Sequence, residues 1–370
     1  MKNAVGIILN VDGEDTTLKD FLQHRSLSTL PFGGRYRLID FTLSNMVNSG
    51  LSHIGVIGSH KYSSLVDHLG TGKEWSLSRK TQDLSILSGS SNNRIGSLIK
   101  INLRNLQNNR TFLEHDSSEH VIIATPNVIT TFNFNGAYNI HLNNDSDITL
   151  IFKKDSDRFN LLDDDIYLDF NKNRVSGIHY KKIKTTNHFF AEMLIIKKSV
   201  LLSLLDLGER TGDWDLMDMI QANVDALRIY GAQHRGFIQR INSLESYMNA
   251  SMNLLEYDVM QELFLGKDSI HTKIKDNHPS LYCDSAQVSN SIVGSGCIID
   301  GTVSHSILFR DTIMNSGSLI QNSIIMQKCE IGKNVSLNYV VMDKDTKIRD
   351  NTRLIGKPHA PIVFKKGSVV

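Results

Sequence analysis

The sequence of 370 residues has few cysteines, no excess of one charge and no long apolar run. Its three cysteines are widely spaced and form no CxxC pair, which is typical of free thiols in a reducing compartment. Forty basic against 39 acidic residues give a net charge of +1, so nothing indicates a nucleic acid or an anionic membrane as a partner. The apolar segment at the N-terminus turns acidic too soon for a signal peptide, and we expect a cytoplasmic protein without a membrane span.

The histidines do not indicate a metal site either. Fourteen are scattered along the chain without an HExxH motif or a close pair, and we expect no bound metal ion. A chain of this length is also too long for one ordinary core, which indicates two domains.

The first part of the chain, up to about residue 262, has an α/β pattern. Continuous apolar runs alternate with helical patterns, which predicts a mostly parallel sheet covered by helices on both faces. The expected strands are 4–9, 53–58, 120–125, 147–153 and 191–197, and the expected helices are 41–50, 62–70, 214–227 and 243–255. The segment 76–118 is polar and weakly periodic, so we expect it to be rich in loops.

After about residue 280 the pattern changes to a repeat. The motifs NSIV, HSIL, NSII and NYVV begin at positions 290, 305, 322 and 338, which gives intervals of 15, 17 and 16. Apolar residues recur six apart, as from Ile307 to Ile313. This period is too long for a helical turn and does not alternate as in a β-sandwich. It is typical of hexapeptide repeats, and we expect a left-handed parallel β-helix.

The expected boundaries are therefore an α/β domain over residues 1–262, a linker over 263–280 and the β-helix over 281–370.

One histidine, His305, lies within a repeat. Hexapeptide solenoids also occur in acyltransferases that use a histidine as general base, but a lone histidine at this place favours a turn residue.

The turn after the first expected strand is acidic. Residues 8–18 read ILNVDGEDTTL, in which Asp12, Glu14 and Asp15 surround a single glycine, Gly13. Nucleotide-binding α/β domains usually place glycine-rich backbone there, because N–H groups hold the phosphates. Three carboxylates would instead repel a triphosphate. A solvated acidic turn and a cation site formed by the carboxylates both remain open, and either is compatible with loss of nucleotidyl transfer.

Taken together, the two parts resemble bacterial glucose-1-phosphate adenylyltransferases over nearly the whole chain. The resemblance rests on PFGGRYRLIDFTLSNMVNSGLSHIGVIG (31–58), SLVDHLGTGKEWSLSRK (64–80), SLESYMNASMNLL (243–255) and the repeats of 290–326. It implies a Rossmann-like nucleotidyltransferase domain followed by the β-helix. In the family, an oxygen of glucose 1-phosphate attacks the α-phosphorus of ATP. A glycine-rich loop with an arginine, a lysine and two magnesium-binding aspartates neutralise the charge.

At each of these positions the chain departs from the family pattern. The loop matches residues 12–18, the family's lysine falls on a leucine, and its two aspartates fall on an asparagine and an arginine. No catalytic residue is therefore expected to be intact. The degenerate positions are Asp12, Gly13, Asp15 and Thr17 in the loop, Leu27 for the lysine, and Asn127 and Arg240 for the aspartates.

The resemblance thus implies a regulatory subunit of the non-catalytic GlgD type within this family. Its expected partner is a catalytic glucose-1-phosphate adenylyltransferase subunit in a hetero-tetramer, with a homo-oligomer possible for the chain alone. No cofactor is expected in this chain, and magnesium only in the catalytic partner. His24, Arg25, Arg37 and Arg353 stay basic near positions where family members bind phosphorylated effectors, although surface arginines are more often simply solvated.

Two other interpretations remain open at this point. One is an active adenylyltransferase with an altered site. The other is a sugar-phosphate-binding assembly protein that has no adenylyltransferase partner.

Overall fold

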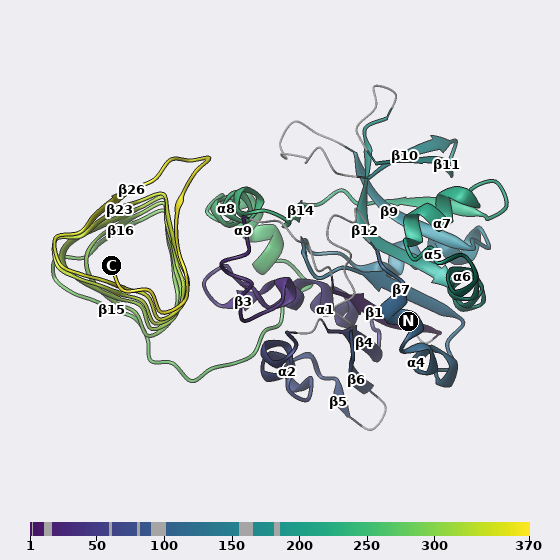
Figure 1. Cartoon of the computed structure of the whole chain (residues 1–370), viewed down its shortest axis with the longest axis horizontal. Coiled ribbons are helices and arrows are strands. Elements are labelled where there is room, and N and C mark those ends of the chain that lie inside the picture. Colours follow the sequence, from purple (N-terminus) through teal and green to yellow (C-terminus); the bar gives the residue numbers. More distant parts are fainter. Residues whose placement is uncertain are drawn as a thin grey trace.

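The computed structural model of the chain has two parts, an α/β domain and a β-helix that Figure 1 shows end-on. The structure describes residues 1, 3–10, 17–58, 61–79, 82–89, 101–154, 166–180 and 186–370. A lipid bilayer could not be spanned by any helix found in this described part of the chain.

A large mixed sheet forms the centre of the α/β domain. Its strand order is β10-β11-β13-β9-β12-β7-β1-β4-β6-β5. The bounds are β1 (Ala4–Leu9), β4 (His53–Ile57), β5 (Ser78–Arg79), β6 (Gln82–Leu87), β7 (His120–Ala124), β9 (Ile148–Lys154), β10 (Tyr167–Asn171), β11 (Arg174–His179), β12 (His188–Lys197) and β13 (Ile229–Gln233). The strands β7-β1-β4-β6 are parallel, whereas β12 runs antiparallel to both β7 and β9.

The fold class is confirmed, and each of the five expected strands is present. The sheet is more mixed than expected, because a continuous apolar run shows that a strand is covered on both faces but not in which direction it runs. The prediction of loops over 76–118 is wrong in part, since β6 extends the parallel region of the sheet. Sequence reasoning missed β6, because its sequence, QDLSIL, alternates polar and apolar residues and is not a continuous apolar run.

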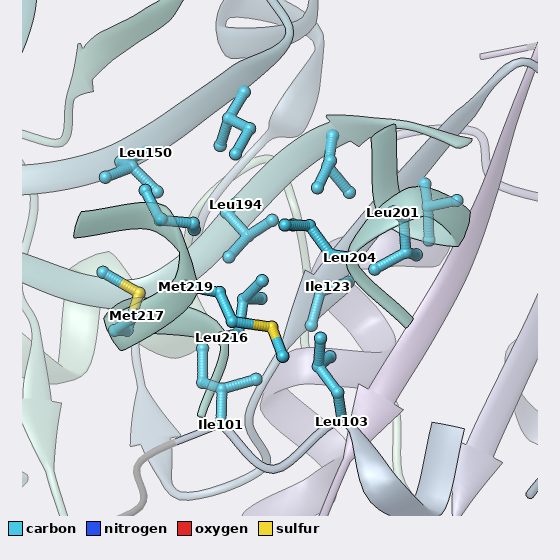
Figure 2. Close-up of a cluster of buried hydrophobic side chains, with 14 of the residues drawn as sticks. Ile101, Leu103, Ile123, Leu150, Leu194, Leu201, Leu204, Leu216, Met217 and Met219 are labelled. Carbon is cyan, nitrogen blue, oxygen red and sulfur yellow. The ribbon is translucent and has the colours of Figure 1, made fainter. Parts of the chain in front are cut away.

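Helices cover both faces of this sheet. Their bounds are α1 (Leu38–Asn48), α2 (Ser63–Leu69), α3 (Arg104–Gln107), α4 (Arg110–His115), α5 (Phe134–Asn143), α6 (Lys198–Thr211), α7 (Leu216–Ala222), α8 (Leu244–Asn253) and α9 (Tyr257–Phe264). Strand β1 contributes alternate residues to two separate cores, Val5 and Ile7 to one and Ala4 and Ile8 to the other. Figure 2 shows part of the first core, where Leu201 and Leu204 of α6 and Met219 of α7 pack over the sheet.

The β-helix begins at β15 and consists of parallel strands only. Its bounds are β15 (Leu281–Tyr282), β16 (Gln287–Ser289), β17 (Ile292–Val293), β18 (Ile298–Ser304), β19 (Ile307–Leu308), β20 (Ile313–Gln321), β21 (Ile324–Ile325), β22 (Glu330–Ile331), β23 (Ser336–Asn338), β24 (Val340–Met342), β25 (Lys347–Ile348), β26 (Arg353–Ile355) and β27 (Ile362–Phe364). Residues 15 to 17 apart lie side by side in successive coils, as Ile292, Ile307 and Ile324 do. The predicted repeat is confirmed.

Left-handed backbone turns form the corners of the coils. Asn290, His305, Asn322 and Tyr339 occupy the same corner of successive coils, with φ angles of 38°, 47°, 47° and 52°. Asparagine tolerates this conformation better than most residues. His305 is therefore a corner residue, and its Nδ1 lies 3.0 Å from Nδ2 of Asn290 in the preceding coil.

The two parts share a third core at their joint. It combines Phe32 and Tyr247 of the α/β domain with Ile307, Ile324 and Val341 on one outer face of the β-helix. Figure 1 shows α8, α9 and β3 (Tyr36–Arg37) on the side of the domain that faces the solenoid. The repeat domain is thus fastened to the α/β domain by apolar packing and is not merely tethered by the linker.

Candidate functional site

The candidate site lies at the carboxyl ends of the parallel strands β1, β4 and β7, where ligands usually bind in open α/β sheets. Strand β1 ends at Leu9, ahead of the acidic segment. Asp12, Gly13 and Asp15 fall within 11–16, outside the described residues, so their predicted roles stay predictions. The neighbouring Thr17 is described, and its Oγ1 accepts a hydrogen bond of 3.0 Å from the backbone N–H of Leu244, at the start of α8.

Asn127 and Arg240 are brought together although 112 residues separate them in the sequence. Strand β8 (Val128–Ile129) follows Asn127 and pairs antiparallel with β14 (Gln239–Arg240), which places Arg240 opposite Val128. The backbone N–H of Ile241 donates to the carbonyl of Asn127 at 2.8 Å, and Asn127 Nδ2 donates to the carbonyl of Ile241 at 3.2 Å. The two positions that the resemblance assigns to metal-binding aspartates are therefore adjacent in the fold.

Arg240 forms a buried ion pair with Glu192. The distance from Nη1 of Arg240 to Oε1 of Glu192 is 2.9 Å, and the two side chains are 12% and 7% exposed. The other carboxylate oxygen of Glu192 accepts a 2.8 Å hydrogen bond from the hydroxyl of Thr125, directly after β7. The guanidinium is thus an internal cation held by the protein itself.

The backbone at Glu192 explains how this carboxylate reaches the site. Strand β12 shifts register between Phe190 and Leu194, and Glu192 has a φ of 54°. Such a bulge redirects a side chain, and bulges are common beside functional sites. Sequence reasoning missed Glu192, because the run AEMLIIK was interpreted only as a strand. A single acidic residue in an otherwise apolar run was the signal.

These residues do not fit a divalent metal ion. Magnesium prefers carboxylate oxygens and water, whereas one of the two positions carries a guanidinium and the other an amide. A metal ion beside Arg240 would meet a like charge in a largely buried environment. Among the described residues, no group of three or more His, Cys, Asp or Glu side chains is arranged to hold a metal.

Leu27 has a structural role in the third core. It is 3% exposed and lies in a short 3₁₀ helix (Leu27–Thr29) that packs with Phe32, Phe41 and Tyr247. The family's lysine at this position must reach a phosphate, whereas Leu27 points into apolar surroundings. A lysine placed here would bury an ammonium group without a partner.

The four predicted effector residues do not gather at one point. His24 and Arg353 are exposed, and Arg353 lies on an outer strand of the β-helix beside Ser336. Arg25 is buried and pairs with Asp343 of the β-helix through two contacts of 2.9 and 3.0 Å. Arg37 donates to the carbonyl and the hydroxyl of Ser64 at 2.7 and 2.9 Å. Arg25 thus has a structural role at the joint, whatever else it binds.

Two further basic residues, Lys344 and Arg310, lie in the region of Arg25 and Arg37, and sequence reasoning missed both. Burial and the nearby charges of Arg25 and Arg37 lower the pKa of Lys344 to about 7. Burial also lowers the pKa of Arg310, which is 8% exposed and whose side chain makes no hydrogen bond or ion pair within the described part of the chain. Both residues come from the β-helix, in turns whose sequence resembles ordinary solvated corners.

Comparison with known proteins agrees with this architecture. The nucleotidyl transferase family model matches residues 5–159, and the model of the GlmU-like C-terminal hexapeptide region matches residues 279–360. The protein class is therefore a nucleotidyltransferase domain joined to a hexapeptide solenoid.

Individual relatives define the family within this class. Glycogen biosynthesis protein GlgD of Geobacillus stearothermophilus is 32% identical over 325 residues, which cover 86% of this chain and 84% of the relative. The protein of the same name from Bacillus subtilis is 29% identical over 95% of this chain and 93% of its own length. Glucose-1-phosphate adenylyltransferase of Fervidobacterium nodosum is 27% identical over 96% of this chain and 86% of its own length. The chain belongs to the GlgD family of glycogen biosynthesis proteins.

Proposed function

We propose that this chain is a catalytically degenerate, regulatory subunit of glucose-1-phosphate adenylyltransferase in glycogen biosynthesis. The observation that carries the proposal is the ion pair between Arg240 and Glu192, next to Asn127. Nucleotidyl transfer requires positive charge on the phosphates, and loss of one electrostatic stabiliser typically costs ~10²–10³ in rate. Here the two aspartate positions and the lysine position have all changed, so little activity of the chain alone is expected.

The partner would be a catalytic adenylyltransferase subunit of similar architecture. A regulatory subunit must bind the catalytic subunit's conformations with unequal affinity, because equal binding shifts nothing. A coupling free energy of about 1–3 kcal/mol corresponds to a change of roughly 5–150-fold in affinity. The preserved fold supports this role, since an intact interface is useful even where the chemistry is lost.

Steady-state kinetics of a catalytic subunit with and without this chain tests the proposal. We expect the chain to raise the partner's turnover, lower its KM or change its response to effectors. Serum albumin at the same concentration serves as the control for non-specific stabilisation. If the two proteins assemble but every kinetic parameter stays unchanged, the chain is not a regulatory subunit.

The two alternative functions, an active enzyme and an assembly protein, each predict a different experimental result. An active enzyme with an altered site would form ADP-glucose without a partner. An assembly protein that binds sugar phosphates would bind glucose 1-phosphate but would not associate with a catalytic subunit. Glu192 and Arg240 neutralise each other, which favours neither of these activities.

We also propose that the basic residues at the joint receive a phosphorylated effector. Arg25, Arg37 and Lys344 lie close enough for their charges to interact, and Arg310 adds an unpaired guanidinium among the described residues. Arginine binds phosphate well because its fork of N–H donors matches the phosphate oxygens. Calorimetric titration with a sugar bisphosphate should show binding that Arg310→Met weakens at least tenfold. Equal affinity of the variant would count against this site.

A further inference from the structure

One outer face of the β-helix carries almost no charge. It is formed by the outward-pointing residues of β16, β18, β20, β23 and β26, which alternate with buried residues such as Val303, Ile320 and Leu337. Pairing between successive coils aligns the outward residues in two rows. We call this surface the polar face, and its members are Gln287, Thr302, Leu319, Ser336 and Arg353 in one row and Ser289, Ser304, Gln321, Asn338 and Ile355 in the other.

The polar face is not the face that packs against the α/β domain. The third core joins the domain to a different face, which carries Ile307, Ile324 and Val341 on β19, β21 and β24. Figure 1 shows β16, β23 and β26 along another side of the coil, away from the side that faces α8 and α9. Within the described part of the chain, the polar face is therefore left open to an external ligand.

The charges of the solenoid lie elsewhere. Of residues 281–370, 17 are charged, but Arg353 is the one charged member of the polar face and lies in the last coil of its row. On the neighbouring outer row, by contrast, Glu330 and Lys347 form an ion pair of 2.9 Å. Charged ligands are attracted and oriented by surface charge of the opposite sign. A surface without charge therefore fits a neutral ligand.

The polar face is rich in groups that both donate and accept hydrogen bonds. Seven of its ten members carry a hydroxyl or a side-chain amide. Within the described part of the chain, the side chains of Gln287, Thr302 and Ser336 make no hydrogen bond, and Nε2 of Gln321 lies 3.4 Å from the hydroxyl of Ser304. Neighbouring coils are about 4.7–4.9 Å apart, and alternate residues along a strand about 6.4–6.8 Å. These groups thus form a regular grid.

The composition of this face differs from that of a protein interface. The cores of protein interfaces are enriched in aromatic residues, methionine and arginine and depleted in serine. The polar face instead has three serines and no aromatic residue. The corner row beside it, Asn290, His305, Asn322 and Tyr339, adds further hydrogen-bonding groups and one phenol ring. Such a ring has an apolar body and a polar tip, which suit the C–H groups and the hydroxyls of a sugar.

We propose that the polar face binds a neutral polysaccharide. Each sugar unit of such a chain has several hydroxyl groups, which can donate to and accept from the serine, threonine, glutamine and asparagine side chains along the rows. Because the chain is uncharged, no charged group has to lose its water on either side of the contact. Each contact is weak, but one chain can engage successive coils at once, which raises the overall affinity. This inference concerns the β-helix and does not depend on the proposed regulatory function.

Native electrophoresis in gels that contain glycogen, a neutral polysaccharide, tests the proposal. We expect glycogen to slow the wild-type chain, relative to a gel without polysaccharide, and to leave serum albumin unaffected. In Gln321→Lys an ammonium group would lose its water beneath the bound chain without gaining an anionic partner, so binding should weaken about tenfold. Ile313→Lys is the matched control, because Ile313 points outward from the same strand, β20, on the neighbouring face, and its binding should persist.

Further gels separate the proposal from its alternatives. Near-ultraviolet circular dichroism checks that each variant is folded, and Thr302→Lys serves if Gln321→Lys is not. The proposal is overturned if glycogen does not slow the wild type, if binding survives both substitutions, or if Ile313→Lys weakens it as much as Gln321→Lys does. Equal or stronger retardation by pectate, an acidic polysaccharide, would show that the recognition is not of a neutral chain. If Gln321→Lys instead prevents assembly with a catalytic relative while the wild type ignores glycogen, the face receives a protein and the proposal is wrong.

Discussion

At the residue scale, Arg240 and Glu192 determine what the candidate site can do. The guanidinium is held by a carboxylate that is itself hydrogen-bonded to Thr125, so both charges are compensated inside the protein. A buried pair of this kind adds little net stability, but removal of one partner leaves an uncompensated charge.

Arg240→Ala should therefore destabilise the protein by about 3 kcal/mol, because it leaves the Glu192 carboxylate buried without its cation. Lys347→Ala is the matched control. It removes a lysine from an ion pair whose side chains are 55% and 48% exposed, and such surface pairs contribute about 0–1 kcal/mol. Urea unfolding measures both. Similar losses of free energy for the two variants would show that the Arg240 pair is not a buried structural contact.

Converting both aspartate positions back should restore a metal site. In Asn127→Asp/Arg240→Asp, two new carboxylates would lie beside Glu192, and their repulsion should lower the Tm in metal-free buffer. Magnesium should then raise the Tm by a few degrees, because a ligand that binds only the folded state stabilises it. Wild type and the exposed control Asn351→Asp/Arg353→Asp should not respond. A magnesium-dependent Tm of the wild type would contradict the assignment of this site as degenerate.

At the scale of elements, the corners of the solenoid set its regular shape. Lys328 is exposed at a corner and has a φ of 60°, in the left-handed region that β-branched residues strongly disfavour. Lys347 is also exposed but lies in strand β25, where β-branched residues fit well.

Lys328→Val should accordingly lower the free energy of unfolding by about 1–2 kcal/mol. Lys347→Val should cost less than about 1 kcal/mol, which corresponds to the loss of its surface ion pair. Thermal and urea unfolding of the two variants provide the comparison. If Lys347→Val is the more damaging change, the corner conformation does not limit which residues the coil accepts.

Elements of this kind could largely be predicted from the sequence. Apolar residues six apart in a frame of 15 to 17 residues define the coils, and continuous apolar runs define the buried strands. Strand β6 could not be found this way, because its apolar residues alternate with polar ones at an end of the sheet.

The residues of the candidate site could be predicted only in part. Asn127 and Arg240 were found through the family resemblance. Glu192 was missed, because a single acidic residue in the apolar run of β12 does not by itself show that a bulge turns its side chain into the site.

At the scale of the whole molecule, the joint couples the α/β domain to the β-helix. The third core and the Arg25–Asp343 pair hold the two parts together, and Lys344 lies beside that pair. The sequence could not reveal this cluster, since its members lie hundreds of residues apart and meet only through the packing of the two domains.

The joint should make stability depend on pH. In the folded protein the pKa of Lys344 is about 7, below its ordinary value of 10.5. Between these values the unfolded chain binds a proton that the folded chain has lost, so the free energy of unfolding should rise with pH, by at most about 1.4 kcal/mol per unit. Below pH 7 both states are protonated and the penalty of burying the charge is present in full.

Lys344→Met should abolish this rise, whereas the exposed control Lys357→Met should keep it. Urea unfolding at pH 6.5, 7.5 and 8.5 gives the comparison. Parallel pH profiles for wild type and Lys344→Met would show that Lys344 stays charged in the folded protein.

The central claim is that a nucleotidyltransferase fold has been kept here while its catalytic charges have been lost. The most direct test is ADP-glucose formation by the purified chain alone, at saturating ATP, glucose 1-phosphate and magnesium, beside a catalytic relative under the same conditions. The predicted result is no more than trace turnover, because Leu27, Asn127 and Arg240 replace the groups that neutralise the triphosphate. Turnover within tenfold of the catalytic relative would contradict the account.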